Sequence, residues 1–525
     1  MGLTLSPSRS GSPTCAVGGC WLHSNYDPKR EALRFAESAI GASKPSHVVL
    51  LGPCLDYLSA AVRFLLPGAR IMSVQHSAFF ENRDSGSADA SWYPQSKVPL
   101  ASFIDATLDE DAISGVVVIE WEPASRAFPA EALAARTAVK ESLDRLASST
   151  ATVKSSGKKW IANACAAFLL VERAWEIAPS SVPILVAAAG PSLRESLLWL
   201  SRIKGGFATI AVSSALSACR SVGVEPDIVV ATDGGFWSRL HLYPLASAAL
   251  PLASPLTALP SSAIYRGSGL VPLNQGSFAE SELLPFLCPA MAVRPHGTVS
   301  GTAIQLAAGL TDGPIILAGL DLASMGEHEH ARPHGFDAFM DATATRTRPL
   351  ESLSWIRGTE SAPLSLSEPP WRGSRSLSAY ASALALDLKP LEERIYRIGP
   401  SPIPLPGFTA ISPSDIDSFQ RHGGSFPRRL NLRSLALPSR SDREIQLSRC
   451  LASWRERAML ASEDLRRGRL PTNPLVAELL RSIDIVDYAA ARRAILSGGE
   501  PETASRDLAS RCDLFLATLE RRFAS

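Results

Sequence analysis

The feature that most constrains the fold is an alternation of short apolar runs with amphipathic helices between residues 183 and 321. The apolar runs have the length and composition of buried strands and cover residues 183–189, 207–213, 227–233, 251–256 and 314–321. Stretches with helical periodicity separate them, at residues 192–203, 213–221 and 300–309. Buried strands that alternate with helices are typical of a parallel sheet with helices on both faces. We therefore predict an α/β fold whose central domain, residues 166–395, is doubly wound and Rossmann-like.

The preceding segment, residues 21–165, carries the same pattern on a smaller scale. Asp27 and Pro28 are the residue types of a helix N-cap and of the first helical position. Residues 47–75 then show a strand, a glycine turn, a helix and a second strand, which is one βαβ unit. With a further buried run at residues 115–123, the segment predicts an N-terminal α/β domain.

The remaining segments have a different character. Residues 1–20 are rich in Ser, Gly and Pro and predict a flexible N-terminus. Residues 127–176 are expected to be largely helical. Residues 396–525 predict a mainly helical C-terminal region that follows an irregular Pro-rich stretch. Its helices are expected at residues 441–465, 474–498 and 502–523.

The balance of charge gives no electrostatic basis for binding nucleic acid or an anionic membrane, because 52 Lys and Arg residues face 51 Asp and Glu. No apolar run reaches the roughly 18 residues that a membrane span needs. The eight cysteines show no CxxC spacing, so neither a metal site nor a disulfide framework is expected. Scattered thiols without a signal peptide predict a cytoplasmic protein.

Several predicted strand ends carry residues suited to ligand binding, and ligands of an open parallel sheet bind beyond the carboxyl ends of its strands. The first is Gly190-Pro191-Ser192, directly before a helix. Glycine lets a ligand approach the backbone, and Ser192 begins a helix whose N–H groups and dipole favour an anion such as phosphate. The same three residues also fit a helix start that binds nothing.

The next two strand ends offer hydroxyls and a carboxylate. Ser213 and Ser214 end one strand and start a helix, and as caps alone they need no ligand. Thr232, Asp233 and Gly234 end the following strand, where the carboxylate suits a ribose or base contact. A simple Asp-Gly turn is the alternative.

Small hydroxylated residues, Thr298 and Ser300, stand at the entrance to the last predicted helix. The strand after that helix ends at Gly319 and Asp321. If the sheet is parallel, its carboxyl edge brings this strand end to the same side as the other three.

Beyond this strand, three of the nine histidines lie within seven residues, at positions 328, 330 and 334. Imidazoles in such a loop suit general acid–base chemistry. A metal site is an alternative, because His330 and His334 have i, i+4 spacing, but Pro333 opposes a helix that would align them and the HExxH order is absent. Solvated loop histidines are a further alternative.

The order of these motifs resembles that of the motility-associated factor (Maf) family, within the wider MptE-like group. The motifs are "GPSL", "GVEPDIVVATD", "GTVSGTA", "PIILAGLDLA" and a following "HA". The segment "LHSNYDPKREA" is similar to the start of the homologous part of Maf proteins, and "SLSAYASALALDL" to "GFTAIS" is similar to the segment that closes their central domain. The resemblance covers about residues 21–415.

The resemblance implies a flagellin glycosyltransferase with a central domain similar to bacterial CMP-sialic acid-dependent sialyltransferases. Such an enzyme is inverting and metal-independent, and uses no cofactor beyond its CMP-sugar donor. It moves a nonulosonic acid (sialic, pseudaminic or legionaminic type) to Ser or Thr of flagellin and so supports flagellar assembly and motility. Ala189 stands where those sialyltransferases usually carry Asn, so one side-chain hydrogen bond to the donor is missing.

The resemblance also implies roles for the candidate residues. His330 falls at the family's histidine–alanine pair and is expected to act as general base, with His334 as second choice. Asp321 is expected to orient the loop or contact the donor. The other donor contacts are expected from Gly190, Pro191, Ser192, Ser213, Ser214, Thr232, Asp233, Gly234, Thr298, Ser300 and Gly319.

Two other functions fit the same motifs. An MptE-like pyrophosphokinase would transfer diphosphate from ATP to a hydroxymethylpterin and would need Mg²⁺, for which Asp233 and Asp321 are the candidate ligands. A non-catalytic, flagellin-binding assembly factor would keep the fold without the chemistry, which Ala189 favours. In each case the flanking domains either hold the protein acceptor or serve as packing modules.

Overall fold

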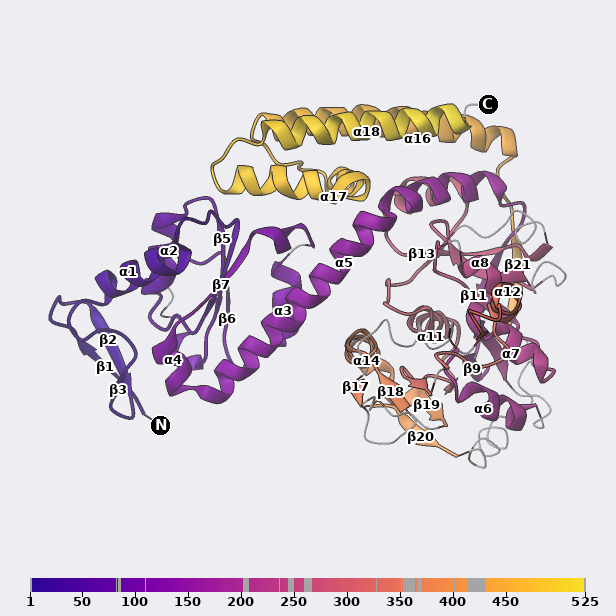
Figure 1. Cartoon of the computed structure of the whole chain (residues 1–525), viewed down its shortest axis with the longest axis horizontal. Helices are drawn as coiled ribbons and strands as arrows, with labels where there is room; N and C mark the ends of the chain where they lie inside the picture. Colours follow the sequence, from indigo (N-terminus) through magenta and orange to yellow (C-terminus); the bar gives the residue numbers. More distant parts are fainter. Residues whose placement is uncertain are drawn as a thin grey trace. The chain divides into compact units, whose positions relative to one another are not determined.

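The computed structural model describes residues 2–523 except for 82, 84–85, 109, 202–206, 236, 244–249, 259–266, 327, 351, 353–363, 366–370, 400–402, 404, 406, 413–414 and 416–429. The chain folds into two compact units. The N-terminal unit consists of Met1–Lys158 and Leu451–Arg522, and the central unit consists of Lys159–Cys450 and Phe523–Ser525. Two long helices drawn in Figure 1, α5 (Pro129–Leu170) and α16 (Arg440–Arg466), each have residues in both units.

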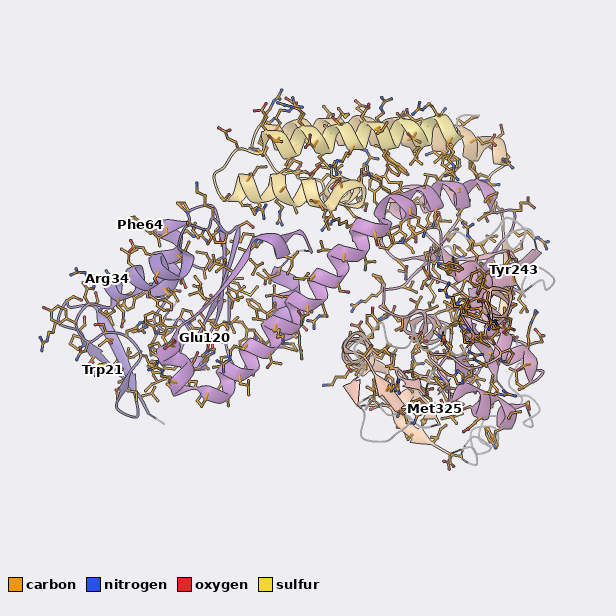
Figure 2. The ribbon with its side chains drawn as sticks, viewed as in Figure 1. Trp21, Arg34, Phe64, Glu120, Tyr243 and Met325 are labelled. Carbon is orange, nitrogen blue, oxygen red and sulfur yellow. The ribbon has the colours of Figure 1, made fainter. Side chains whose placement is uncertain are left out.

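The N-terminal unit contains a four-stranded parallel sheet with strand order β6-β5-β4-β7. Its strands are β4 (His47–Leu51), β5 (Arg70–Val74), β6 (Ala90–Trp92) and β7 (Val116–Glu120), the last ending at the residue labelled in Figure 2. Helices α1 (Pro28–Ile40) and α2 (Tyr57–Leu65) pack against each other and against the sheet. The predicted βαβ unit is confirmed, and so is the helix start, where Asp27 accepts a hydrogen bond from the Arg30 amide.

Residues 1–20 were predicted to be a flexible N-terminus, and this prediction is wrong from Leu3 on. From Leu3 to Trp21 the chain forms an antiparallel meander of three strands, β1 (Leu3–Pro7), β2 (Pro13–Val17) and β3 (Cys20–Trp21). The Gly and Pro residues that suggested flexibility lie mostly at its turns and strand ends. Three apolar side chains, Cys15, Val17 and Leu22, are buried in the core of the unit, whereas Leu5 and Trp21 are exposed.

Helices complete the N-terminal unit. After the meander and sheet come η1 (Ala78–Phe80), α3 (Leu100–Thr107), η2 (Glu110–Gly115), α4 (Glu122–Ala127) and the first part of α5. The chain ends with α16, α17 (Pro474–Leu496) and α18 (Glu502–Phe523). These three match the predicted C-terminal helices, but from Leu451 on they pack with the N-terminal domain and do not form a separate region.

The central unit contains an eleven-stranded sheet with the order β20-β19-β15-β9-β10-β11-β12-β13-β8-β21, and β14 pairs with β13. All pairs are parallel except that of β21 with β8. The strands are β8 (Ala174–Ala178), β9 (Ile184–Ala187), β10 (Ala208–Val212), β11 (Ile228–Val230), β12 (Leu252–Pro255), β13 (Leu270–Asn274), β14 (Met291–Ala292), β15 (Ile315–Ala318), β19 (Ile395–Ile398), β20 (Thr409–Ile411) and β21 (Asn431–Leu435). The predicted doubly wound, Rossmann-like fold is confirmed.

Every residue of β9, β10, β11 and β15 is buried, as expected for parallel strands that are covered on both faces. The helical elements that surround the sheet are α6 (Leu193–Leu200), η3 (Ser213–Ala215), α7 (Leu216–Ser221), α8 (Ser238–Leu242), α10 (Phe278–Leu287), α11 (Val299–Leu310), α12 (Asp337–Thr343), α14 (Arg375–Leu388) and η5 (Lys389–Arg394). Arg443 of α16 is buried and donates hydrogen bonds to the Phe168 and Val171 carbonyls, so it caps the last turn of α5.

The central sheet also extends beyond the predicted domain. Residues 174–176, the end of the segment expected to be helical, belong to β8. This strand forms because it pairs with β13 and β21, which local periodicity does not reveal. Strand β13 was not predicted, and β19 and β20 continue the sheet past residue 395. A small separate sheet consists of β16 (Ser324–Met325), β17 (Leu364–Ser365) and β18 (Trp371–Gly373). Parts of the predicted Pro-rich stretch, including residues 400–402 and 413–414, lie outside the described residues.

Across the described parts of the chain, no helix combines the length and the apolar character needed to cross a membrane.

Candidate functional site

The topology of the central sheet singles out one place on its carboxyl edge. From β9 the chain proceeds to β10, β11, β12 and β13 on one side, and then returns to β15 on the other side of β9. Ligands of open α/β sheets bind where the strand order reverses in this way. We call the turns that follow β9 (residues 188–192) and β15 (residues 319–321) the central switch point.

The two turns of the central switch point are joined by hydrogen bonds. The Gly190 amide donates to the Gly319 carbonyl over 2.8 Å. The Ser192 amide donates to Asp321 Oδ2 over 2.8 Å, and the Ser192 hydroxyl donates to Asp321 Oδ1. Four residues that the sequence predicted for the site are thus in direct contact, although 129 positions separate Ser192 from Asp321.

The glycines of these turns are required by packing within the protein. A Cβ at Gly190 would lie 2.5 Å from both the Gly319 carbonyl oxygen and Asp321 Oδ2. Gly319 has a φ of +70°, and its Cβ would lie 2.6 Å from that of Leu193. Glycine at position 190 was predicted to let a ligand approach the backbone. In the structure it is the turn after β15, residues 319–321, that approaches the backbone at Gly190.

Asp321 is the electrostatic centre of the central switch point. Its side chain is buried, and burial raises the pKa of the carboxyl, while the Ser192 hydrogen bonds and the positive charge of Arg397 act in the opposite direction. The Asp321 carboxylate already accepts hydrogen bonds from the amide and the hydroxyl of Ser192. These are the groups at the start of α6 that were predicted to bind a phosphate. The direct contact of Ser192 with a donor phosphate therefore stays a prediction.

Arg397 on β19 is a charged residue of this region that sequence reasoning missed. It pairs in register with Leu317 of β15, and burial lowers its pKa while Asp321 raises it. Its Nε and Nη1 atoms are buried and have no hydrogen-bond partner among the described residues. Only the pairing of β19 with β15 brings this guanidinium to the site, and no local motif marks it.

The histidine loop lies beside the first turn of the central switch point. The Ala331 amide donates to the Ala189 carbonyl over 2.9 Å, which places His330 next to residues 188–192. The rings of His330 and His334 are stacked with centroids 4.7 Å apart. The predicted general base and its second choice thus lie together, half-buried, at the edge of the sheet.

His334 is held in a defined orientation. Its amide donates to Asp337 Oδ2 over 2.7 Å, and its Nδ1 accepts a hydrogen bond from the Phe336 amide over 3.3 Å. An Nδ1 that accepts leaves the proton of the neutral ring on Nε2. His328, by contrast, is exposed, and its backbone forms a bridge with Met325.

His241 of α8 is a third imidazole of this group, which sequence reasoning also missed. Its ring is buried and lies 4.6 Å from that of His334. Gly335 makes this contact possible, because a Cβ there would lie 2.7 Å from the His241 Cα. A lone histidine in an apolar helix gives no local signal, so only the fold reveals it.

The turn after β11 joins the same group through α8. The Ser238 hydroxyl donates to the Asp233 carbonyl over 2.8 Å, and the Asp233 carboxylate accepts the Gly235 amide over 2.7 Å. Asp233 is exposed, whereas Gly234 is buried beneath Asn163, whose side-chain amide donates to the Gly234 carbonyl. The carboxylate is therefore accessible from solvent at this edge.

Other predicted residues have contacts of a structural kind. Thr298 accepts a hydrogen bond from the Gly301 amide and so caps α11. Ser213 is buried at the start of η3, against which α8 packs. Pro191 is buried, and Ser214, Thr232 and Ser300 are half-buried. Roles of these residues in donor binding stay predictions.

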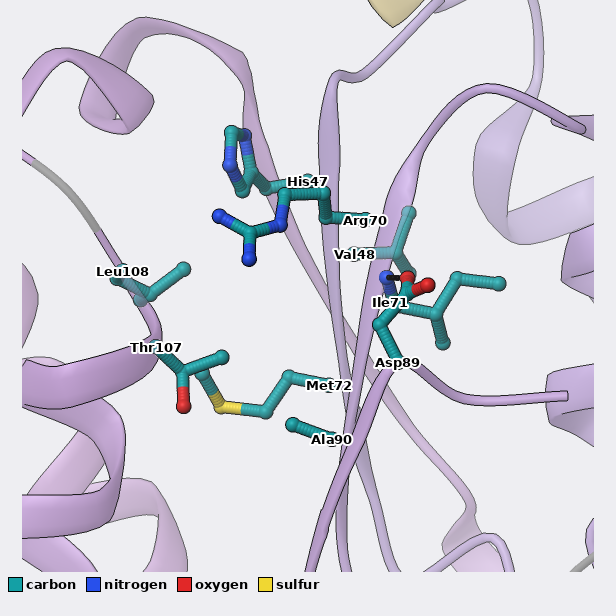
Figure 3. Close-up of a pocket in the computed structure, with 9 residues that line it drawn as sticks. All are labelled: His47, Val48, Arg70, Ile71, Met72, Asp89, Ala90, Thr107 and Leu108. Atoms are coloured by element: carbon teal, nitrogen blue, oxygen red, sulfur yellow. Dashed lines mark hydrogen bonds between the residues drawn. The ribbon is translucent and has the colours of Figure 1, made fainter. Parts of the chain in front are cut away.

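A cavity of about 30 Å³ lies elsewhere, in the N-terminal unit (Figure 3). It is lined by the first residues of β4 and β5, His47 and Arg70, and by Asp89 and Thr107. Asp89 accepts a hydrogen bond from the Ile71 amide, drawn as a dashed line. This cavity lies at the amino ends of its strands and has room for about one or two water molecules. It does not fit a nucleotide or a sugar.

Among the described residues, no group of three or more His, Cys, Asp or Glu side chains has the arrangement of a metal site.

Comparisons with known proteins show what the fold and one domain of this chain are similar to. Residues 169–327 match the family model described as 6-hydroxymethylpterin diphosphokinase MptE-like. The fold is similar to that of the MAf glycosyltransferase from Magnetospirillum magneticum AMB-1, with a TM-score of 0.57 at 12% identity, over 99% of this chain and 90% of that one. The resemblance to Maf proteins and the MptE-like domain, both expected from the motif order, are confirmed.

A sequence relative is known from Treponema pallidum (strain Nichols). This uncharacterized protein is 31% identical over 252 residues, which are 48% of this chain. The chain spans 56% of the length of that relative.

Proposed function

We propose that the protein is a glycosyltransferase that moves a nonulosonic acid from a CMP-sugar to Ser or Thr hydroxyls of flagellin. The observation that carries the proposal is the stacked pair of His330 and His334 beside the central switch point. A half-buried imidazole at the place where α/β sheets bind ligands suits an enzyme that must deprotonate an alcohol. The similarity of the fold to a Maf glycosyltransferase supports the same activity.

In the proposed reaction, His330 accepts the proton of the acceptor hydroxyl. The hydroxyl oxygen then forms a bond to the anomeric carbon of the donor, and the bond from this carbon to the phosphate oxygen breaks, so that CMP leaves with the electron pair. One displacement of this kind inverts the anomeric centre. His334 and His241, in ring contact with each other, hold the base in place.

The departing CMP carries negative charge that the protein has to balance. Arg397 is suited to balance this charge, since its positive charge already acts on Asp321 and lowers the pKa of that carboxyl. Asp321 joins the two turns and keeps Ser192 fixed, so its role in the proposal is to position the site. Asp233, exposed at the neighbouring strand end, is suited to accept hydrogen bonds from a ribose.

The proposal is tested by incubating the full chain with purified flagellin and a CMP-nonulosonic acid and measuring the intact mass of flagellin. Wild-type protein should add the mass of the sugar, and His330→Ala should not. His328→Ala is the matched control, because this exposed histidine lies in the same loop and should leave the transfer unchanged. Flagellin that binds but gains no mass with any CMP-nonulosonate would contradict the proposal and favour an assembly factor.

The MptE-like family description favours a second candidate, transfer of diphosphate from ATP to a hydroxymethylpterin. That reaction should depend on Mg²⁺ bound by carboxylates. In this chain the Asp321 carboxylate is bonded to Ser192 and that of Asp233 to the Gly235 amide. Calorimetric binding of ATP that requires Mg²⁺ and exceeds that of CMP would support this candidate.

A further inference from the structure

A chain of ring contacts leads from the candidate base to the surface of the central unit. His334 lies 4.9 Å from Phe336, and Phe336 lies 6.4 Å from Trp237. Trp237 in turn contacts Phe339 at 4.9 Å in an edge-on arrangement. We call Trp237 and Phe339 the aromatic pair.

The aromatic pair is accessible to a partner. Trp237 is 46% exposed and Phe339 is 39% exposed, although both are large apolar side chains. Phe339 belongs to α12, a helix in which no residue is buried. A helix with no buried face gains little from packing within its own chain, so an exposed aromatic residue on it indicates a binding surface.

The aromatic pair lies close enough to His330 to contact the acceptor polypeptide. A general base has to lie within hydrogen-bond distance of the hydroxyl it deprotonates. The centroid steps from His330 to His334, from His334 to Phe336 and from Phe336 to Trp237 are 4.7, 4.9 and 6.4 Å. Trp237 therefore lies within about 16 Å of His330, a span that about five residues of extended chain cover at about 3.3 Å per residue. A polypeptide whose Ser or Thr is placed at His330 therefore carries its neighbouring side chains to the aromatic pair.

Two charged residues near the aromatic pair neutralise each other. Arg332 comes shortly before His334 and Asp337 begins α12, and their charged atoms are 3.6 Å apart. Asp337 also accepts the His334 amide. Since neither charge is left over for a phosphate or carboxylate, the surface suits an apolar group better than the anionic part of a donor.

We propose that Trp237 and Phe339 bind an apolar side chain of the acceptor polypeptide, within about five residues of the Ser or Thr that receives the sugar. The inference rests on the proposed function, which requires a protein acceptor at His330. It adds a determinant of which Ser or Thr is used. Hydroxyls with an apolar neighbour at that spacing are selected, and those in purely polar segments are not.

The test compares Trp237→Ala and Phe339→Ala with Tyr243→Ala in the full chain. Tyr243, labelled in Figure 2, follows α8 and is 69% exposed, so it controls for the loss of a surface aromatic residue. Affinity for purified flagellin is measured without donor, and the KM values for flagellin and for the CMP-sugar are measured with it. Trp237→Phe keeps an aromatic ring and checks that effects are not caused by misfolding.

Each alanine variant of the aromatic pair should bind flagellin about tenfold more weakly and raise its KM by about tenfold, the factor that corresponds to about 1.4 kcal/mol. The donor KM and the slow hydrolysis of the donor by water should stay unchanged, as should all values for Tyr243→Ala. Trp237→Phe should lie within about threefold of wild type.

Three results would overturn the inference. These are unchanged flagellin affinity in both alanine variants, an equal loss in Tyr243→Ala, or a rise in the donor KM, which would assign the pair to stacking on the nucleobase. Failure of the proposed function gives a different pattern. Wild-type protein would then bind flagellin through the aromatic pair but neither transfer nor hydrolyse the donor.

Discussion

The molecule contains two parallel sheets, each with its own switch point, and the residues at the two switch points differ in kind. In the N-terminal unit the order reverses at β4, between β5 and β7. The turn after β4 begins at Gly52, with a φ of +66°, and a Cβ there would lie 2.6 Å from the His76 ring. His76 is only 2% exposed. A neutral ring of the protein itself therefore packs onto the glycine turn.

Further rings pack around the same place. His23 is buried between Trp121 and Tyr57, with ring centroids 5.4 and 5.3 Å away, and its Nε2 accepts the Leu55 amide. Burial lowers the pKa of both His23 and His76 to about 4, so both rings are neutral near pH 7. The central switch point instead holds the Asp321 carboxylate, and the Arg397 guanidinium and two half-buried imidazoles lie beside it. Similar topology thus yields a packed core in one unit and a candidate site in the other.

The largest effect expected from this difference is on catalysis. His330→Ala should lower the rate of sugar transfer by about 10²–10⁴-fold, because it removes the proposed general base. His76→Ala, in the N-terminal unit, should leave the rate within about twofold. Single-turnover measurements with CMP-nonulosonate and flagellin check both values. A comparable loss of transfer rate in His330→Ala and His76→Ala would contradict the proposal that the reaction takes place in the central unit alone.

The second prediction concerns how tightly the glycine turn of the central switch point is packed, measured as a loss of the free energy of unfolding. Gly190→Ala should reduce the free energy of unfolding by about 3 kcal/mol or more, because its Cβ meets backbone and carboxylate atoms at 2.5 Å. Gly276→Ala is the control, since its φ is +79° but no atom lies within 4 Å of the added Cβ, and about 1 kcal/mol is expected. Urea denaturation measures both. Equal effects would show that the two turns of the central switch point are loosely packed.

Acid should affect the titratable groups packed at the two switch points with opposite sign. For His23 and His76 the pKa is about 4 in the folded protein and 6.5 when unfolded, so the unfolded chain binds more protons as the pH falls from 6.5 to 4. Each histidine then costs up to about 3 kcal/mol of stability at pH 4 and nothing above pH 6.5. Burial raises the pKa of Asp321, so the folded protein holds this proton more tightly than the unfolded chain, and the contribution of Asp321 becomes more favourable as the pH falls through its raised pKa.

Thermal melts of wild type and His76→Phe between pH 7.5 and 4.5 check this prediction. The variant should lose less stability in acid than wild type. An unchanged pH dependence would show that His76 is not neutral and buried in the way described.

The smallest effect concerns Arg397. Arg397→Met removes a half-buried cation with two buried nitrogens that lack hydrogen-bond partners among the described residues, so the free energy of unfolding should change by less than about 1 kcal/mol. The kcat/KM for the donor should fall about tenfold, because the charge that balances departing CMP is lost. Steady-state kinetics with varied donor checks this. A large loss of stability with unchanged kcat/KM would make Arg397 purely structural.

Particular residues show how far the sequence could predict this molecule. The strands around Gly190 and Asp321 were predicted because apolar runs followed by glycine turns are local signals. That Asp321 bonds to Ser192 was not predicted, since 129 residues separate them and only strand order brings them together. His241 and Arg397 were missed for the same reason. The meander of residues 3–21 was missed because its buried residues are few and lie among turn-forming ones.

Hydrogen–deuterium exchange with and without a CMP-nonulosonic acid tests the central claim most directly, because it shows which of the two switch points binds the donor. The account predicts slower exchange in residues 188–193 and 319–334 when the donor is present, and no change in residues 51–57 and 75–77. Protection confined to the N-terminal turns, or no protection at saturating donor in either unit, would contradict it.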